Sequence, residues 1–496
     1  MFANVDGSTE FPSPLTLTAL RRGVIGSNHL LDTPFGRKRL IYADYTASGR
    51  ALAQVEDWIR DKALPFYANA HTEVSACGAQ MNRMRKAARA AIAASVQAGQ
   101  SCDVIFCGAG ATAAVNRLPH LFGLRTGAGD RPVVLVGPYE HHSNILPWRE
   151  AGAETVDVAE APVGGVDLDD LQRLLSRYAG QRRVIGAFSA ASNVTGILTD
   201  VVAVTRVLKA HGALAVWDYA CGAPYLRMSM HPAPDAPIDA LVFSPHKFPG
   251  GPGASGVLVL RRDAVRTRRP TTPGGGSVSY VSGWAHDYYD DIVLREEAGT
   301  PNILGDLRAA LALMIRDRFG VEAIAHRGQR FLDRALAIWR SNPRIVLLGH
   351  PTAERLPIVS FLIKDARGRI AHHRLVTRML SDLYGVQARE GCSCAGPYGH
   401  RLLNVDRSLS EHIRGQINAG QVLAKPGWTR LNFCHLLDDY TADCIIDAVQ
   451  TLPDAIDRHA ADYVADPRTG NFQHVDTAPA AATPTFHSTP FSQEVA

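Results

Sequence analysis

The chain has 496 residues, and its 52 Lys and Arg against 48 Asp and Glu give a formal net charge of +4. A charge this small for the length favours neither nucleic acid nor a membrane surface as a partner. No apolar run approaches the roughly 20 residues that cross a bilayer. The N-terminal MFANVDGSTEFPSP lacks the basic start and apolar core of a secretory signal. These features predict a globular cytoplasmic protein, and the length predicts two domains.

Between about residues 41 and 325, short apolar segments alternate with helical ones. The expected strands are 133–137, 183–189, 213–219 and 240–244, and the expected helices include 82–96, 170–179 and 200–212. Short runs rich in Val and aromatic residues are typical of buried parallel strands. The alternation therefore predicts a large α/β domain, with helices on both faces of a mostly parallel sheet.

A different pattern follows a helical stretch near 306–341. Strand-like segments at 344–349, 357–364 and 429–435 are separated by helices. They predict a smaller α+β domain made of residues 326–463 and completed by residues 1–40. The last segment, 464–496, is rich in Pro, Ala and Thr and is expected to be a disordered tail.

The eight cysteines are not expected to form a disulfide framework in a long intracellular chain. The only close pair is Cys392 and Cys394. A zinc site would need two such pairs, or histidines at ligand spacing. No metal is therefore expected.

Three polar clusters stand where strands end, which is where open α/β sheets bind ligands. Lys247 follows the strand 240–244 and precedes a glycine-rich loop, a setting that suits a lysine forming a Schiff base, although most loop lysines are simply solvated. Asp218 ends the strand 213–219, where it could hold a pyridine nitrogen protonated or merely cap a helix. The small-residue run 107–116 fits a phosphate cradle at a helix start.

Together, these clusters resemble the class V, fold-type I pyridoxal-phosphate (PLP) enzymes, and within them the group II cysteine desulfurases and selenocysteine lyases. The resemblance extends from about Tyr42 to His435. Its motifs are YADYTASGR (42–50), AHTEVS (70–75), EHHSNILPW (140–148), ASNVTG (191–196) and EAGTPN (297–302).

The resemblance implies that PLP is carried by Lys247 and that His141 stacks on its ring and assists proton transfer. It implies that Asn193 lies beside the 3-oxygen and that Thr300 reaches the phosphate of a neighbouring subunit, so that a homodimer is expected. The full set of expected cofactor-binding residues is Ala111, Thr112, His141, Asn193, Asp218, Ser244, His246, Lys247 and Thr300.

The segment REGCSCAGP (389–397) matches the motif R-x-G-x-x-C-A-x-P of the same enzymes, with Cys394 as the nucleophile. The resemblance implies that L-cysteine is converted to L-alanine, that Cys394 holds the sulfur as a persulfide, and that an acceptor protein receives it. Arg389, Arg430 and Asn193 are the expected substrate-binding residues, since arginine suits the planar contact with a carboxylate.

Three departures from the motif set keep alternatives open. Cys221 replaces the usual glutamine beside the 3-oxygen, Cys392 is an additional thiol, and residues 398–426 are expected to add a helix over the active site. One alternative is that the protein catalyses a different PLP-dependent reaction, as a C–S lyase, selenocysteine lyase, epimerase or aminotransferase. A non-enzymatic protein, either a PLP-fold scaffold or a sulfur-carrier binding module, is a further alternative, disfavoured by the intact set Lys247, Asp218 and His141.

Overall fold

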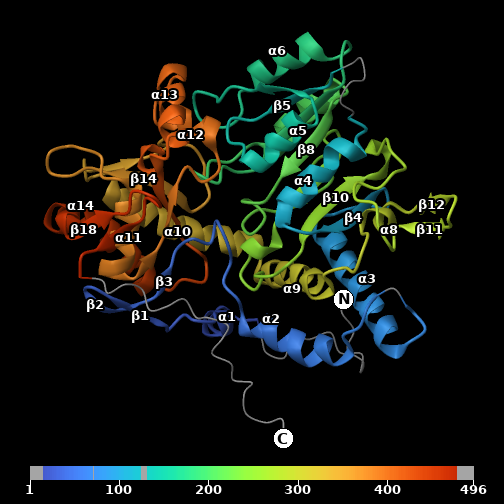
Figure 1. Ribbon diagram of the computed structural model, residues 1–496, viewed down its shortest axis with the longest axis horizontal. Coiled ribbons are helices and arrows are strands. Elements are labelled where there is room, and N and C mark those ends of the chain that lie inside the picture. The colour runs from blue at the N-terminus through green and yellow to red at the C-terminus, as the bar shows by residue number, and fades with distance from the viewer. Residues whose placement is uncertain (1–14, 71, 125–130, 477–496) are drawn as a thin grey trace, which may run out of the picture.

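The computed structural model of this protein describes residues 15–70, 72–124 and 131–476. Two groups of elements, one around a seven-stranded sheet and one around a four-stranded sheet, are joined through α9 and α10 (Figure 1). The helices are α1 (Leu17–Gly23), α2 (Ala53–Trp58), α3 (Ala76–Ser95), α4 (Gly110–Leu121), α5 (Leu146–Glu150), α6 (Leu168–Tyr178), α7 (Val201–Ala210), α8 (Ile292–Glu296), α9 (Ile303–Phe319), α10 (Val321–Trp339), α11 (His373–Tyr384), α12 (Gly396–Leu402), α13 (Arg407–Asn418) and α14 (Asp439–His459). His71, in the segment 70–75, lies outside the described residues.

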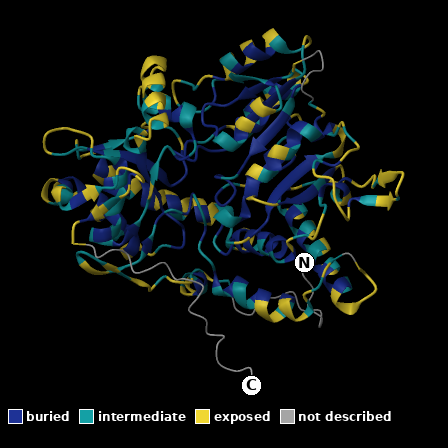
Figure 2. Ribbon diagram, in the orientation of Figure 1, coloured by how far each residue is buried: buried dark blue, intermediate teal, exposed yellow. Residues whose placement is uncertain are grey.

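The seven-stranded sheet contains the strands that the apolar runs predict. Its order is β4 (Cys102–Cys107), β10 (Gly256–Arg261), β9 (Ala240–Phe243), β8 (Leu214–Asp218), β7 (Val184–Ser189), β5 (Val133–Val136) and β6 (Glu154–Asp157). Neighbouring strands from β9 to β6 are parallel, whereas β10 is antiparallel to both β4 and β9. All residues of β5, β7 and β9 are buried, as Figure 2 shows for the centre of the sheet.

Helices cover both faces of this sheet, which confirms the predicted fold class. Alternate residues of a strand point to opposite faces, so Val133 and Leu135 pack in one core cluster with side chains of α3, α6, α7 and α9. Val134 and Val136 pack in another with side chains of α4 and α5. Figure 1 shows α4 and α5 in front of the sheet. No helix among the described residues has the length and apolar character needed to cross a membrane.

The helical stretch predicted near 306–341 is two helices. Gly320 has a φ of 92°, which an L side chain rarely adopts, and it separates α9 from α10. The predicted boundary at residue 325 falls inside α10. The division into domains at that residue therefore stays a prediction.

The four-stranded sheet is antiparallel, in the order β13 (Ile345–Leu347), β14 (Ile358–Ile363), β17 (Trp428–Asn432) and β16 (Arg389–Gly391). Side chains of α10, α11 and α14 form its core with Phe361 and Leu431. The short strand β15 (Val386–Gln387) pairs in parallel with β3 (Ile41–Tyr42), so the N-terminal segment contacts this group. Two further pairs of strands are β1 (Leu30–Thr33) with β2 (Gly36–Arg39), and β11 (Val278–Val281) with β12 (His286–Tyr288), and a third pair lies near the end of the described residues.

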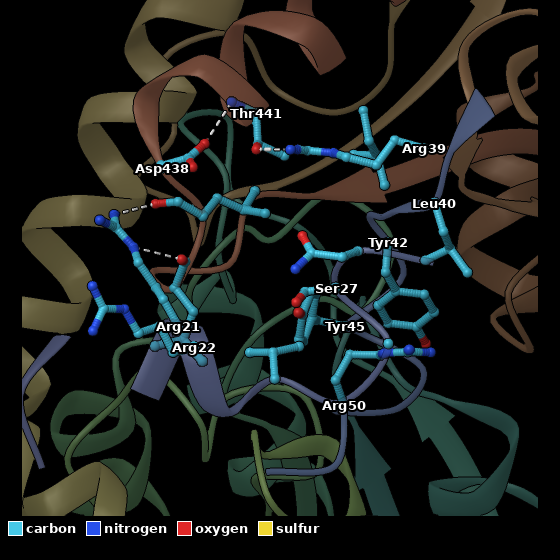
Figure 3. A pocket seen from close by; sticks show the side chains of 16 residues that line it. Arg21, Arg22, Ser27, Arg39, Leu40, Tyr42, Tyr45, Arg50, Asp438 and Thr441 are labelled. Carbon is cyan, nitrogen blue, oxygen red and sulfur yellow. Dashed lines mark hydrogen bonds between the residues drawn. The ribbon is translucent and has the colours of Figure 1, made fainter. Parts of the chain in front are cut away.

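The N-terminal segment also meets the start of α14 around a cavity of about 250 Å³ (Figure 3). Arg21 donates to the carbonyls of Leu436 and Leu437 at 2.8 and 2.6 Å, and Arg39 donates to the Thr441 hydroxyl. Asp438 caps α14 by accepting from the Thr441 amide. In Figure 3 the guanidinium groups of Arg21 and Arg39 point to these wall acceptors and do not converge on one point. This cavity therefore lies at a structural contact between the N-terminal segment and the start of α14.

The predicted disordered tail begins too early. Strand β18 (Tyr463–Ala465) pairs antiparallel with β19 (Phe472–His474). Contacts of buried Tyr463 hold the pair in place, since its hydroxyl donates to Asp382 and its ring packs edge-on against His474. Residues 477–496 of the predicted tail lie outside the described residues. The predicted extra helix within 398–426 exists as α13, which follows the short α12.

Candidate active site

The carboxyl ends of β4, β5, β7, β8 and β9 share one edge of the large sheet. The loops that follow them surround a cavity of about 170 Å³. Its lining residues are Ala109, Ala111, Thr112, His141, Ser143, Ser189, Ala191, Asn193, Asp218, Ala220, Cys221, Ser244, His246 and Lys247. Eight of the nine expected cofactor-binding residues are therefore in one place, as parallel strand topology requires.

One end of the cavity is the start of α4. The backbone N–H of Ala111 donates to the Ser244 hydroxyl at 2.8 Å, and the hydroxyls of Thr112 and Ser143 are 2.7 Å apart. A Cβ added to Gly110 would lie 2.8 Å from Ser244 Oγ, and Gly110 has a φ of 59°. Glycine is therefore needed here for both space and backbone conformation. The result is a group of hydroxyls at the start of a helix, which suits an anion.

Lys247 lies in the short helical turn Pro245–Lys247 directly after β9. Burial lowers its pKa, although the neighbouring groups of Cys221 and Asp218 oppose the shift. Burial likewise raises the pKa of Asp218, against a hydrogen bond from the Ala220 N–H and the charge of Lys247. The cavity thus holds an amine that gives up its proton more readily than a free lysine.

His141 follows β5 and is held in a defined tautomer. Its Nδ1 accepts the Ser143 N–H at 3.1 Å, so a proton on the neutral ring is on Nε2. Burial and the charge of Lys247 lower its pKa to about 3. The adjacent Glu140 is buried and accepts from the Ser189 N–H and hydroxyl, both at 2.7 Å. The His141 ring is therefore neutral, and hydrogen bonds hold both the ring and the adjacent Glu140 in place.

Asn193 and Cys221 form the next part of the wall. Asn193 Oδ1 is buried and has no hydrogen-bond partner within the described part of the chain. The Cys221 thiol donates to the Ser192 carbonyl at 3.7 Å, and burial raises its pKa to about 11. Cys221 is thus a neutral thiol where the resemblance expects a glutamine, and Asn193 has an acceptor available for a ligand.

Asn193 also connects the cavity to the two expected substrate arginines. Arg389 and Arg430 are directly paired across β16 and β17. Buried Arg430 donates to the Asn193 carbonyl and to Asp44 Oδ1, both at 2.8 Å, and its Nε is buried without an acceptor in the described ranges. Arg430 is therefore anchored beside the cavity but faces a carboxylate, Asp44, that sequence reasoning did not assign.

The cysteine loop is a tight turn. The Ala395 N–H donates to the Cys392 carbonyl at 3.0 Å, and the two residues between them have positive φ. Asn193 Nδ2 donates to the Ser393 carbonyl at 2.7 Å. The turn thus reaches the cofactor cavity through Asn193, while Cys392 lines a separate cavity of about 210 Å³ beside α12 and α13.

Cys394, Arg389, Arg430 and Thr300 are not among the residues that line the 170 Å³ cavity. The first three lie next to it, through Asn193, whereas Thr300 is exposed. Sequence reasoning missed Asp44, His142 and Ser189. Asp44 lies in the motif YADYTASGR, and His142 lies in EHHSN. The position of each residue within its motif was the sequence feature that could have identified it.

The aminotransferase class-V family profile matches residues 41–414, and the chain belongs to this family. It is 30% identical over 372 residues to a cysteine desulfurase of Pectobacterium atrosepticum, covering 74% of this chain and 87% of that protein. It is 29% identical over 364 residues to a cysteine desulfurase of Serratia proteamaculans, covering 72% of this chain and 85% of that protein.

Two solved structures have the same fold. The apo cysteine desulfurase of Thermococcus onnurineus NA1 aligns with a TM-score of 0.70 at 21% identity, over 90% of this chain and 99% of that one. The cysteine desulfurase CsdA of Escherichia coli, in an S-sulfonic acid form, aligns with a TM-score of 0.70 at 20% identity, over 89% and 100%. These matches confirm the predicted fold-type I architecture.

Proposed function

We propose that this protein is a PLP-dependent cysteine desulfurase that converts L-cysteine to L-alanine and holds the sulfur as a persulfide on Cys394. The observation that carries the proposal is the single cavity lined by Lys247, Asp218 and His141, with the Cys394 turn attached to its wall through Asn193. The similarity to cysteine desulfurases of two bacteria supports the same reaction.

The residues of the cavity fit PLP by their chemistry. The helix start at Ala111 and the side chains of Thr112, Ser244 and His246 would hold the phosphate, in a cradle that a Cβ at Gly110 would fill. Asn193 Oδ1, a buried acceptor without a donor in the described residues, would receive the ring hydroxyl. Asp218 would hold a proton on the ring nitrogen, and the bound cofactor supplies an electron sink for the substrate carbon.

Each polar group around the substrate then has a separate task. Arg430, with Arg389 beside it, binds the α-carboxylate, since a guanidinium has donors beyond those that Asn193 and Asp44 use. Lys247 would hold the cofactor, and its amine would take the proton from the substrate α-carbon, a task eased by its lowered pKa. Neutral His141 lines the cavity where the cofactor would bind, and its Nε2 would assist proton transfer.

Cys394 carries out the sulfur transfer. Its thiolate attacks the sulfur of bound L-cysteine, so that an S–S bond forms and the Cβ–S bond breaks. The electron pair left on the substrate is taken up with a proton, and L-alanine leaves. Cys394 then bears the persulfide, which a sulfur-acceptor protein receives.

We propose further that the enzyme is a homodimer. Thr300 is exposed and lies apart from the cavity of its own chain, so the phosphate-binding role that the resemblance implies for it has a use only across an interface. Sedimentation of the cofactor-loaded protein is expected to give a dimer at micromolar concentration. An active, cofactor-loaded monomer would contradict this. The cytoplasmic location stays a prediction.

The proposed reaction is tested by the products formed from L-cysteine. Purified protein supplied with PLP and a reducing thiol should release alanine and sulfide in equal amounts. Selenocysteine and cystathionine serve as parallel substrates, because the alternatives act on related amino acids. Pyruvate as the main product would replace the proposal with a C–S lyase, and no turnover of any amino acid would replace it with a scaffold.

A further inference from the structure

The turn that carries the proposed nucleophile has an unfavourable backbone. Ser393 and Cys394, its two central residues, have φ values of 51° and 56°. Positive φ at both central positions is the pattern of a type I′ turn, which strongly favours Asn-Gly. Side chains with a Cβ in this region carry a steric cost. Contacts from outside the turn must therefore hold it.

Those contacts come from loops of the large sheet. The N–H of His142 donates to the Cys394 carbonyl at 2.7 Å, and His142 Nε2 accepts the Gly396 N–H at 2.9 Å. Asn193 Nδ2 donates to the Ser393 carbonyl at 2.7 Å. His142 thus contacts the backbone on both sides of Ala395, directly after the nucleophile.

The ring of His142 is suited to this contact. Burial lowers its pKa, and the charges of Lys425 and Arg149 act in the same direction. A lowered pKa keeps the ring neutral at neutral pH, so that Nε2 can accept a hydrogen bond. The N–H of Gly396 belongs to the first turn of α12, where a helix leaves its donors unsatisfied. Without His142 this donor lacks its partner.

We infer that His142 is a positioning residue that holds the Cys394 turn in its reactive conformation, an assignment that rests on the proposed function for its catalytic meaning. His142 acts through backbone groups and is distinct from His141, which faces the cavity. The imidazole Nε2 of His142 accepts the Gly396 N–H after Cys394, and the backbone N–H of His142 donates to the Cys394 carbonyl. The strained turn thereby keeps one orientation during sulfur transfer.

The test compares three variants that all retain the backbone N–H of residue 142. His142→Leu removes the side-chain acceptor, His142→Gln keeps an oxygen near the place of Nε2, and His142→Asn has an oxygen too short to reach it. His211→Leu is the matched control, because His211 is a half-buried histidine that contacts a backbone carbonyl, that of Val207, far along the chain from the turn.

Two measurements are made on each variant of the cofactor-loaded protein: kcat and KM for alanine release, and the rate at which iodoacetamide alkylates Cys394, read by peptide mass spectrometry against exposed Cys77. In His142→Leu and His142→Asn we expect kcat to fall on the order of tenfold, since the half-buried Gly396 N–H loses its acceptor. The Cys394 alkylation rate should change relative to Cys77, while KM and the cofactor absorbance stay as in wild type. His142→Gln and His211→Leu should stay within about threefold of wild type.

Equal kcat and alkylation in wild type and His142→Leu would overturn the inference, and so would a loss in His142→Gln as large as in His142→Leu. If His142→Leu does not fold, the comparison of Gln with Asn carries the same test. If wild type releases no alanine, the proposed desulfurase function fails, whereas the alkylation rates still decide whether His142 positions the turn.

Discussion

The cofactor cavity and the cysteine turn obtain their geometry in different ways. The cavity is assembled from loops at the ends of parallel strands, and beside it the positive φ at the start of α4 belongs to a glycine, Gly110. The turn places Ser393 and Cys394 in a backbone region that favours glycine, and contacts from His142 and Asn193 hold it there. The cavity follows from the local fold, whereas the turn depends on contacts between the two sheets.

This difference indicates where the protein can change without losing its reaction. A cavity built by regular elements keeps its shape when one lining side chain is altered. A turn that is unfavourable by itself changes when a distant contact is removed. Substitutions in the cavity should therefore alter chemistry, and substitutions around the turn should alter the position of the nucleophile.

The largest effect is expected from Lys247→Ala in the cavity. The variant should lose all alanine release and also the yellow cofactor absorbance that borohydride traps in wild type, because no other amine lines the cavity within the described residues. Peptide mapping after borohydride reduction identifies the labelled lysine. A label on another lysine of the wild type would refute the cofactor assignment.

The next largest effect separates the two thiols of the turn. Cys394→Ser should abolish alanine release and persulfide formation while the cofactor absorbance stays unchanged, because the cavity residues remain in place. Cys392→Ser should keep substantial alanine release, since Cys392 lines the other cavity beside α12 and α13. An alanine assay measures the release of alanine by each variant. Mass spectrometry of the peptide that contains residues 392 and 394, after treatment of the protein with cysteine, measures persulfide formation. Full alanine release by Cys394→Ser would remove the desulfurase mechanism.

A moderate effect is expected at Arg430, the proposed substrate arginine, which contacts both Asn193 and Asp44. Arg430→Lys keeps the charge but loses the planar pair of donors, so KM for L-cysteine should rise about tenfold. Arg378→Lys on α11 is the control, since Arg378 is ion-paired with Asp382 outside the site. Steady-state kinetics give both values. An unchanged KM would mean that Arg430 serves only the Asp44 ion pair and that another group binds the carboxylate.

The same contrast explains what could be predicted from the sequence. The strands β5, β7, β8 and β9 were identified because buried parallel strands are continuous apolar runs, and polar residues at their ends then had to meet at one edge. Lys247 and Asp218 followed from that topology. The break at Gly320 was missed because a helical pattern of buried residues continues on both sides of it.

The turn could not be predicted in the same way. Its positive φ values contradict the local preferences of Ser and Cys, so nothing in the sequence around residue 393 indicates this turn. The contacts that overrule those preferences come from residues 200 or more positions away. Asp44 was missed for the same reason, because its partner Arg430 lies 386 positions along the chain.

The smallest effect is expected from Ser393→Gly, which tests directly whether the turn is strained. Glycine adopts positive φ without a steric cost, and the substitution also removes the Ser393 hydroxyl, which is buried without a partner among the described residues. Glycine also has more conformational freedom than serine in the unfolded chain, and this lowers the free energy of unfolding. The balance should stabilise the protein by about 1 kcal/mol, seen as a higher urea midpoint. Ser341→Gly, at an exposed serine that has no positive φ, should lower the midpoint slightly. A lower midpoint in Ser393→Gly would show that the turn carries no strain and that His142 holds a conformation the chain adopts by itself.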